Sequence, residues 1–336
     1  MTGKIGDWAR RGWQFLQSGV REALAAFWVI FKITFPIILA VRVAEEFFPL
    51  VSALGGVLEP LTRLLGLPGE LGVAWAAAIL VQPLSGFAIV AERWNELELT
   101  VAQATIFGVL ILEVHAIFVE VRIAQLLGSR AWVTCVLRFG FAIGLGLLLN
   151  WLYGFSAAMQ EPARLHFIAP QDVDASWSGW LLFQAQSWLV FGAIIVGLTL
   201  LMKAIRAWHV EKLLSFLLRP FMSLMKIHRS AGTVSIVGLI LGLTFGAALL
   251  LTEKSKGLVS ARDMFLTVSL LGICHSLLDD TLLTMLFGAH LSGVLAARLL
   301  CALAFMAVFA RLLQLLSDAQ LRRWFMTRHA SGATAA

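Results

Sequence analysis

The sequence predicts an all-α polytopic membrane protein built from two inverted repeats, each with about three spanning helices plus a re-entrant helical hairpin. Composition is the first reason. Apolar residues make up 60% of the 336 positions and charged residues 14%, whereas soluble domains average about 45–50% and about 25%. A soluble core could not cover that much apolar surface. Helices are expected because an open sheet edge in lipid would leave backbone groups unpaired.

Long apolar runs are the second reason. Each is close to the roughly 20 residues that cross about 30 Å of hydrocarbon once its flanks are counted. The runs are Phe27–Val41, Val73–Ile89, Trp132–Leu149, Trp180–Met202, Val234–Leu251 and Val294–Phe309. Residues 1–25 interleave Trp, Phe and Arg, which favours an amphipathic segment on the membrane surface, with an ordinary juxtamembrane tail as the alternative.

An internal repeat is the third reason. Shifting the chain by 160 positions (275 − 115) places His115 on His275 and Glu120 on Asp280 without a gap. The same shift aligns Pro60 with Pro220, Gly86 with Gly246, Gly128 with Gly288, Arg138 with Arg298 and Trp28 with Trp188. The expected organisation is an N-terminal segment 1–25, repeat 1 at 26–155, an extramembrane linker at 156–185, repeat 2 at 186–315 and a basic tail at 316–336.

Each repeat is expected to contain the same elements in the same order. In repeats 1 and 2 these are a first span (27–48; 187–208), a short amphipathic piece, a second span (71–91; 233–251), a histidine segment (101–127; 261–287) and a last span (132–153; 291–313).

The distribution of Lys and Arg predicts the topology. If the histidine segments crossed the membrane, each repeat would cross four times, and the basic stretch 203–229 would lie outside, against the usual bias. If they dip in and return, each repeat crosses three times and the second is inverted. We favour this second arrangement, which puts both termini in the cytoplasm, and we expect a bacterial inner membrane. Inverted repeats with interrupted segments are a transporter design.

Ionisable residues within the apolar runs are the main site candidates. The stretch "GICHSLLDDTLLTMLFGAH" carries His275, Asp279 and Asp280, and repeat 1 offers His115 and Glu120, with Glu113 just before them. A central Asp, Lys or Arg costs at least about 2.5–3.5 kcal/mol on insertion scales, so such residues are functional by default. The duplicated acid lies five positions after the histidine and would point away from it on a continuous helix. A break near the histidine would let both face one cavity.

Polar residues at a second helix interruption are further candidates. In "VQPLSGFA", Gln82 and Ser85 flank Pro83, which removes a backbone donor and frees a carbonyl to face a ligand. Thr244 lies in the equivalent segment of repeat 2, and Ser276 follows His275. These four groups would hydrogen-bond a polar substrate.

Two structural interpretations of the charged residues remain open. Arg138 and Arg298 lie one helix further on at equivalent positions and could neutralise Glu120 and Asp280 as structural ion pairs. The histidines could serve only to hydrogen-bond neighbouring helices.

Three motifs carry a resemblance to a known family. "LGLPGELGVAWAAAILVQPLSGFA", "ELTVAQATIFGVLILEVHAIFVE" and "CHSLLDDTLLTMLFGAH" resemble the Gate, or nucleoside-recognition, family of membrane domains, in particular its stand-alone two-copy members. The resemblance covers both repeats. Related domains form the membrane part of bacterial ferrous-iron transporters and occur in spore maturation proteins, and a distant similarity to concentrative nucleoside transporters agrees with the inverted topology. Because no GTPase domain is expected before the membrane part, transport would need another energy source or a partner.

Three functions follow as alternatives. The first is a secondary transporter or channel for a small polar solute or cation, acting at a midplane site between the repeats. A divalent metal such as Fe²⁺ would be its substrate, not a cofactor, with His115, Glu120, His275 and Asp280 as ligands, since imidazole and carboxylate suit that ion. The second is a nucleoside or nucleobase transporter with a histidine–carboxylate pair carrying a coupling proton. The third is a non-transporting membrane scaffold or assembly partner.

The sequence also indicates which partners and which activity to expect. The expected partners are the lipid bilayer, the transported solute or cation, and either further copies of the chain or another protein, but no nucleic acid. An enzyme is not expected, because the histidine–acid spacing is not that of HExxH zinc proteases and no activated Ser or Cys constellation stands out.

Overall fold

The computed structural model describes residues 50–80, 82–166, 176–207, 220–225, 227–255 and 259–327, with scattered residues between 13 and 43 and residues 216 and 218. These residues form helices and no β-strand, apart from two isolated bridges. The all-α prediction is therefore confirmed for the described chain. The predicted segment 1–25 and the first span at 27–48 lie largely outside the described residues, as do parts of the linker and the tail.

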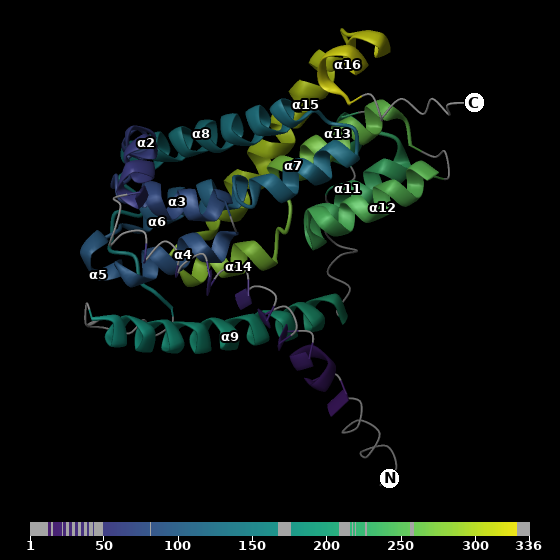
Figure 1. Ribbon diagram of the computed structural model, residues 1–336. Helices are drawn as coiled ribbons and strands as arrows, with labels where there is room; N and C mark the ends of the chain where they lie inside the picture. Colours follow the sequence, from purple (N-terminus) through teal and green to yellow (C-terminus); the bar gives the residue numbers. More distant parts are fainter. Residues whose placement is uncertain are drawn as a thin grey trace. The chain divides into compact units, whose positions relative to one another are not determined.

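Contacts divide the chain into two compact units, residues 1–53 with 165–210, and residues 54–164 with 211–336. The first unit contains α9 (Trp177–Ala207), a helix of 31 residues (Figure 1). Trp188 on α9 packs edge-on against Phe27 and Phe31, with ring centroids 5.9 and 4.9 Å apart. The helix begins at Trp177, ten residues before the predicted start of the span at residue 187.

The other described helices belong wholly or mainly to the second unit. They are α2 (Leu50–Leu64), α3 (Leu71–Leu80), α4 (Pro83–Glu92), α5 (Trp94–Leu97), α6 (Val101–Glu113), α7 (Ile117–Leu126), α8 (Ala131–Ser156), α11 (Arg229–Leu241), α12 (Leu243–Ser255), α13 (Ala261–Ile273), α14 (Asp279–Leu286), the π-helix η1 (Ser292–Ala297), α15 (Arg298–Leu313) and α16 (Asp318–Phe325).

The helix boundaries of this unit follow the shift of 160 positions found in the sequence. Helix α6 and helix α13 coincide at both ends under that shift. Each starts at a hydroxyl N-cap, Thr100 or Ser260, whose side chain accepts the backbone N–H three residues further on. After each helix one residue takes a left-handed conformation, Ala116 with φ of 43° and Ser276 with φ of 49°. The same local chemistry therefore produces the same break in both halves.

The two predicted second spans are helical hairpins. Helices α3 and α4 pack against each other, and a Cβ at Gly86 would lie 2.6 Å from the Ala74 carbonyl oxygen. Helices α11 and α12 are joined at Gly242, where φ is 100°. Gly238 and Gly246, each four residues from Gly242 along the chain, lie against each other. Helices that meet in this way run antiparallel. A 10-residue helix is about 15 Å long and cannot span the bilayer alone, so the prediction of a single span was wrong.

The histidine segments were expected to turn back, whereas the first of them is bent at its break without folding back on itself. Helices α6 and α7 are bent by only 42° at their break. The long helix α8 packs along both of them, and the Val101 N–H at the start of α6 donates to the Glu161 carbonyl just beyond α8, at 2.9 Å. The chain therefore runs on through the break. The expected turn lies one element earlier, between α3 and α4. The sequence did not reveal this, because a hairpin of two short helices and a single span have the same apolar length.

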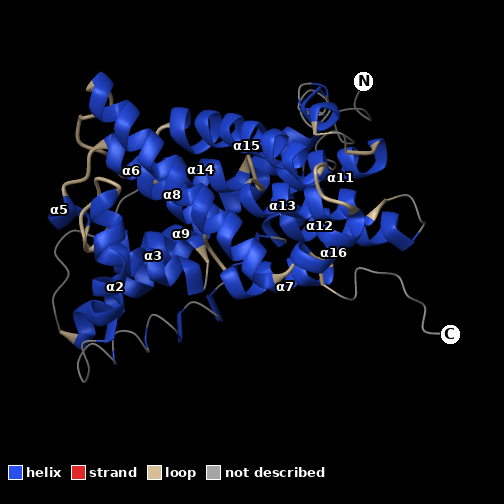
Figure 2. Cartoon of the chain, turned by 90° about the horizontal axis from the view of Figure 1, so that it is seen from above, coloured by secondary structure: helices blue, strands red, loops and turns tan. Residues whose placement is uncertain are grey.

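Long helices complete the membrane architecture. Within the described ranges, α8, the Trp177–Gly197 part of α9, and η1 with α15 are long and apolar enough to cross a membrane, and α6 with α7 would make a fourth, broken span. Figure 2 shows the chain from above, with helices and loops and no strand among the described residues. Helix α16 carries exposed Arg322 and Arg323 on a short amphipathic helix, and its Phe325 carbonyl accepts the Arg130 N–H at 3.0 Å.

Candidate functional site

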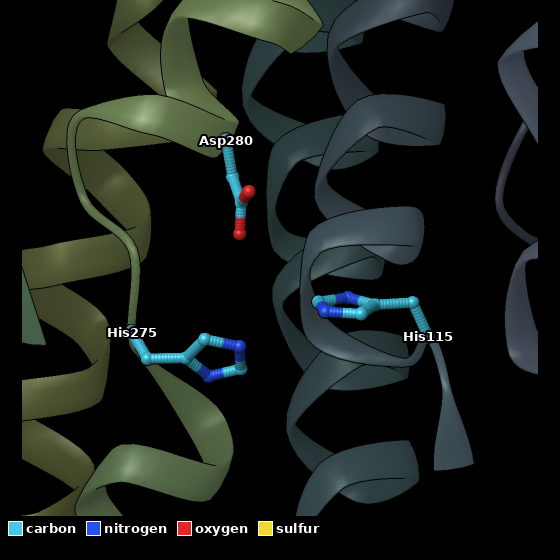
Figure 3. Close-up of side chains that lie close together, drawn as sticks. All are labelled: His115, His275 and Asp280. Carbon is cyan, nitrogen blue, oxygen red and sulfur yellow. The ribbon is translucent and has the colours of Figure 1, made fainter. Parts of the chain in front are cut away.

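The two breaks bring the duplicated histidines together at the centre of the second unit. His115 lies between α6 and α7, and His275 lies between α13 and α14. Their ring centroids are 5.4 Å apart. Asp280, in the first turn of α14, points toward the same space, and one ligand atom from each of the three side chains lies within 4.8 Å of the others (Figure 3). Residues separated by 160 positions in the sequence thus face each other.

Each histidine is held in one orientation by its own helix. The Nδ1 atom of His115 lies 2.9 Å from the Ile111 carbonyl, and that of His275 lies 2.7 Å from the Leu271 carbonyl. A carbonyl can only accept, so Nδ1 must donate and carry a proton. The Nε2 atom of a neutral ring is then a lone pair aimed into the site. Metal-binding histidines are commonly oriented by a backbone carbonyl in this way.

Glu120 joins the two rings. Its Oε1 atom lies 2.9 Å from Nε2 of His115 and 3.5 Å from Nε2 of His275. The three side chains are 5–8% exposed, so solvent does not separate them. With both rings neutral, two lone pairs and a carboxylate oxygen would face each other without a donor. The contact becomes favourable only when a proton or a metal cation is shared among them, because buried acceptor atoms that face one another without a donor are costly.

Two fully buried arginines surround this cluster. Arg138 pairs with the second oxygen of Glu120, and its Nε donates to the Glu113 carbonyl at 2.8 Å. Arg298 pairs through Nε with the Glu113 carboxylate at 2.8 Å and donates from Nη2 to the His275 carbonyl at 3.0 Å. Both guanidinium groups therefore lie where α6 and α13 end, a position where the helix dipole favours positive charge.

Glu113 was noted just before His115 in the sequence but was not among the predicted site residues, and the structure places it in the cluster. It is the last residue of α6 and is fully buried against Arg298. The repeat gave no signal for it, because the equivalent position in the second half is Ile273. Its acidic side chain within an apolar helix, two positions before His115, was the signal available.

The remaining predicted site residues lie at the breaks and hairpins. Asp279 precedes Asp280 in the first turn of α14, and a Cβ on Gly242 would lie 2.9 Å from Ser276 Oγ, so the α11–α12 turn abuts the second break. Gln82 is the half-buried N-cap of α4, and Ser85 lies on that helix with 1% exposure. The side chain of Thr244 is outside the described residues.

The fold and site together define an integral, all-α membrane protein with a buried cluster of histidines, carboxylates and arginines. The chain is similar to the uncharacterized membrane protein YvoD of Bacillus subtilis (strain 168), with 25% identity over 288 residues, 84% of this chain and 89% of YvoD. No family model matches the chain. No solved structure matches it either.

Proposed function

We propose that the protein is a secondary transporter or channel of the Gate type that moves a small cation, with a divalent metal such as Fe²⁺ as substrate. The observation that carries this proposal is the contact of two histidine lone pairs with one carboxylate oxygen, at 2.9 and 3.5 Å from Glu120 Oε1. Such a site is incomplete without a cation. Imidazole and carboxylate ligands suit divalent iron, and the histidine orientation matches that of metal ligands elsewhere.

The charges of the cluster support the same proposal. Glu113, Glu120 and Asp280 contribute three negative charges, while Arg138 and Arg298 contribute two positive charges. The described residues provide no ion-pair partner within 4.0 Å for Asp280, whereas each of the other two carboxylates has an arginine. A bound cation would balance the remaining negative charge in a region where an unbalanced charge is expensive.

Inverted repeats around this site are part of the proposal. The start of α6 lies near the end of α14, where the His290 N–H donates to Thr105 Oγ1 at 2.8 Å. The start of α13 lies near the end of α7, where Phe265 packs on Phe325 and the Phe325 carbonyl accepts the Arg130 N–H. These contacts support opposite directions for the two broken spans. One span, a broken span and a last span in each repeat would again give three crossings and cytoplasmic termini.

Broken spans support a transport role because their ends meet at the site. The C-termini of α6 and α13 and the N-termini of α7 and α14 all lie next to His115 or His275. Transporters bind substrates at such interruptions near the bilayer midplane, where irregular backbone is protected by protein.

A nucleoside or nucleobase transporter with proton coupling is the second candidate. The shared position among His115, Glu120 and His275 would hold a proton instead of a metal. Two buried hydroxyls support it, because Ser85 Oγ and Thr281 Oγ1 have no hydrogen-bond partner among the described residues. Buried hydroxyls without partners are suited to bind a polar substrate.

Uptake into proteoliposomes tests both candidates. We expect saturable uptake of Fe²⁺, measured anaerobically alongside Mn²⁺ and Zn²⁺, and its loss in the double variant H115A/H275A. The exposed His290 supplies the control, His290→Ala, which should leave uptake unchanged. Saturable uptake of labelled nucleosides without metal uptake would favour the second candidate. Absence of uptake for every solute, together with a co-purifying protein, would instead favour a scaffold.

A further inference from the structure

The two buried arginines occupy equivalent positions in the repeats but form ion pairs with carboxylates that are not equivalent. Under the shift of 160 positions Arg138 corresponds to Arg298, and Glu120 corresponds to Asp280. Arg138 pairs with Glu120, so the equivalent pair would be Arg298 with Asp280. The structure instead has Arg298 on Glu113, at 2.8 Å. The ion pairs therefore differ between the repeats in the partner of one guanidinium group, that of Arg298.

Two local differences between the halves accompany this exchange of partners. Glu113 has Ile273 at the equivalent position, so only the first half offers an additional carboxylate. The residues before Arg298 form the π-helix η1 (Ser292–Ala297), whereas the residues before Arg138 belong to the regular helix α8. A π-turn closes its hydrogen bonds over five residues, which changes the direction of the side chains that follow, and such turns are frequent at functional sites.

The consequence for Asp280 follows directly. Arg298 is fully buried and close enough to Asp280 to interact with it electrostatically. Because Arg298 is held by Glu113, the Asp280 carboxylate is left beside His115 and His275, within 4.8 Å of both ligand nitrogens.

We propose that Glu113 is a positioning residue that holds Arg298 away from Asp280 and so leaves Asp280 as a ligand for a divalent cation. This inference rests on the proposed metal transport. A buried guanidinium without a partner is strongly unfavourable. If Glu113 lost its charge, Arg298 would turn to the nearest carboxylate without an arginine, which is Asp280. The guanidinium would then neutralise the carboxylate that the cation needs.

The same arrangement accounts for the choice of a divalent ion. Two neutral imidazoles, the Glu120 carboxylate already shared with Arg138, and a free Asp280 form a mixed nitrogen and oxygen ligand set. Such a set suits Fe²⁺, Mn²⁺ or Zn²⁺ better than an alkali ion. If Asp280 were paired with an arginine, the ligand set would lose the negative charge that Asp280 contributes.

The experiment is anaerobic titration of Fe²⁺ into purified full-length protein in detergent, by calorimetry. Glu113→Gln keeps the shape of the side chain and should weaken Fe²⁺ binding at least about tenfold, as loss of an outer-shell partner does. The control Glu59→Gln removes a half-exposed carboxylate paired with Arg63 outside the cluster and should bind as wild type does. The double variant E113Q/R298Q removes the competing guanidinium and should recover most of the lost affinity, which a merely structural role of Glu113 would not allow.

The outcomes separate this inference from the proposed function. Wild type that binds no Fe²⁺ would overturn both. Wild-type binding retained in Glu113→Gln, or a loss in Glu113→Gln that E113Q/R298Q fails to recover, would overturn the role of Glu113 alone. If Glu113→Gln does not fold, the double variant decides by itself: binding within about threefold of wild type supports the inference, and a loss of tenfold or more, the size expected for a lost outer-shell partner, overturns it.

Discussion

The two breaks share one backbone design but carry different charges. Both follow a helix with the same bounds under the shift of 160 positions, contain a left-handed residue and present a histidine tied to a carbonyl four residues earlier. In the first break Glu120 contacts both histidines and an arginine. In the second, Asp280 faces the histidines without an arginine. The two halves of the site therefore share a backbone frame but are unequal in the charged residues that they carry.

The largest expected effect comes from removing Arg138. Arg138→Gln leaves the Glu120 carboxylate buried without its cation and should lower the free energy of unfolding by about 3–5 kcal/mol. Thermal denaturation in detergent measures the change. The control is Arg311→Gln, at an exposed position in α15, which should stay within about 0.5 kcal/mol of wild type. If R138Q/E120Q is not more stable than Arg138→Gln, the pair is not the source of the effect.

The histidines should dominate cation binding. His275→Ala removes a direct ligand, so we expect Fe²⁺ affinity to fall by more than the 10–100-fold, roughly, that outer-shell changes cause. His115→Ala should have a similar effect, because both rings contact the same carboxylate oxygen. Calorimetric titration checks this, with His228→Ala at an exposed N-cap as control. Equal affinity in wild type and His275→Ala would show that the second break takes no part.

Much of the site could be predicted from the sequence, because it is duplicated. The match of His115 with His275 and of Glu120 with Asp280 identified residues that the structure brings together, and the spacing of five positions indicated a break. Glu113 could not be found in the same way, because its equivalent is Ile273. The partner of Arg298 depends on the direction that η1 gives that side chain, which the gap-free alignment does not reveal.

The hairpins show why the fold was only partly predictable. The run from Leu71 to Glu92 has the length and hydropathy of one span, and only Gln82 and Pro83 mark the turn between α3 and α4. In the second half the marker is Gly242 alone, without a proline. Because the number of apolar residues is the same for a span and a hairpin, composition could not distinguish them.

Close packing within a hairpin should tolerate little change. Gly86→Ala places a methyl group 2.6 Å from the Ala74 carbonyl oxygen, and we expect a loss of about 1–3 kcal/mol in stability. Gly140→Ala in α8 has open space around it and should be neutral or stabilising by up to about 1 kcal/mol. Melting of both variants in the same detergent makes the comparison. Equal stability would mean that α3 and α4 do not pack as described.

The smallest effect concerns the left-handed residues at the breaks. Ala116→Gly relieves a conformation that costs a residue with a Cβ roughly 1–2 kcal/mol, partly offset by the greater entropy of glycine in the unfolded chain. We expect a net gain of about 0.5 kcal/mol or less from this balance. Ser276→Gly should behave alike if the two breaks are equivalent. Chemical denaturation resolves the pair, and a loss in one break alone would show that its left-handed residue has a further role.

X-ray absorption spectroscopy tests the central claim most directly. Purified protein loaded anaerobically with Fe²⁺ should show a bound ion with two imidazole nitrogens and carboxylate oxygens in its coordination shell. The imidazole signal should disappear in H115Q/H275Q, because Nε2 of both rings faces the shared position. Protein that retains no iron after desalting, or an imidazole signal that persists in H115Q/H275Q, would contradict the account.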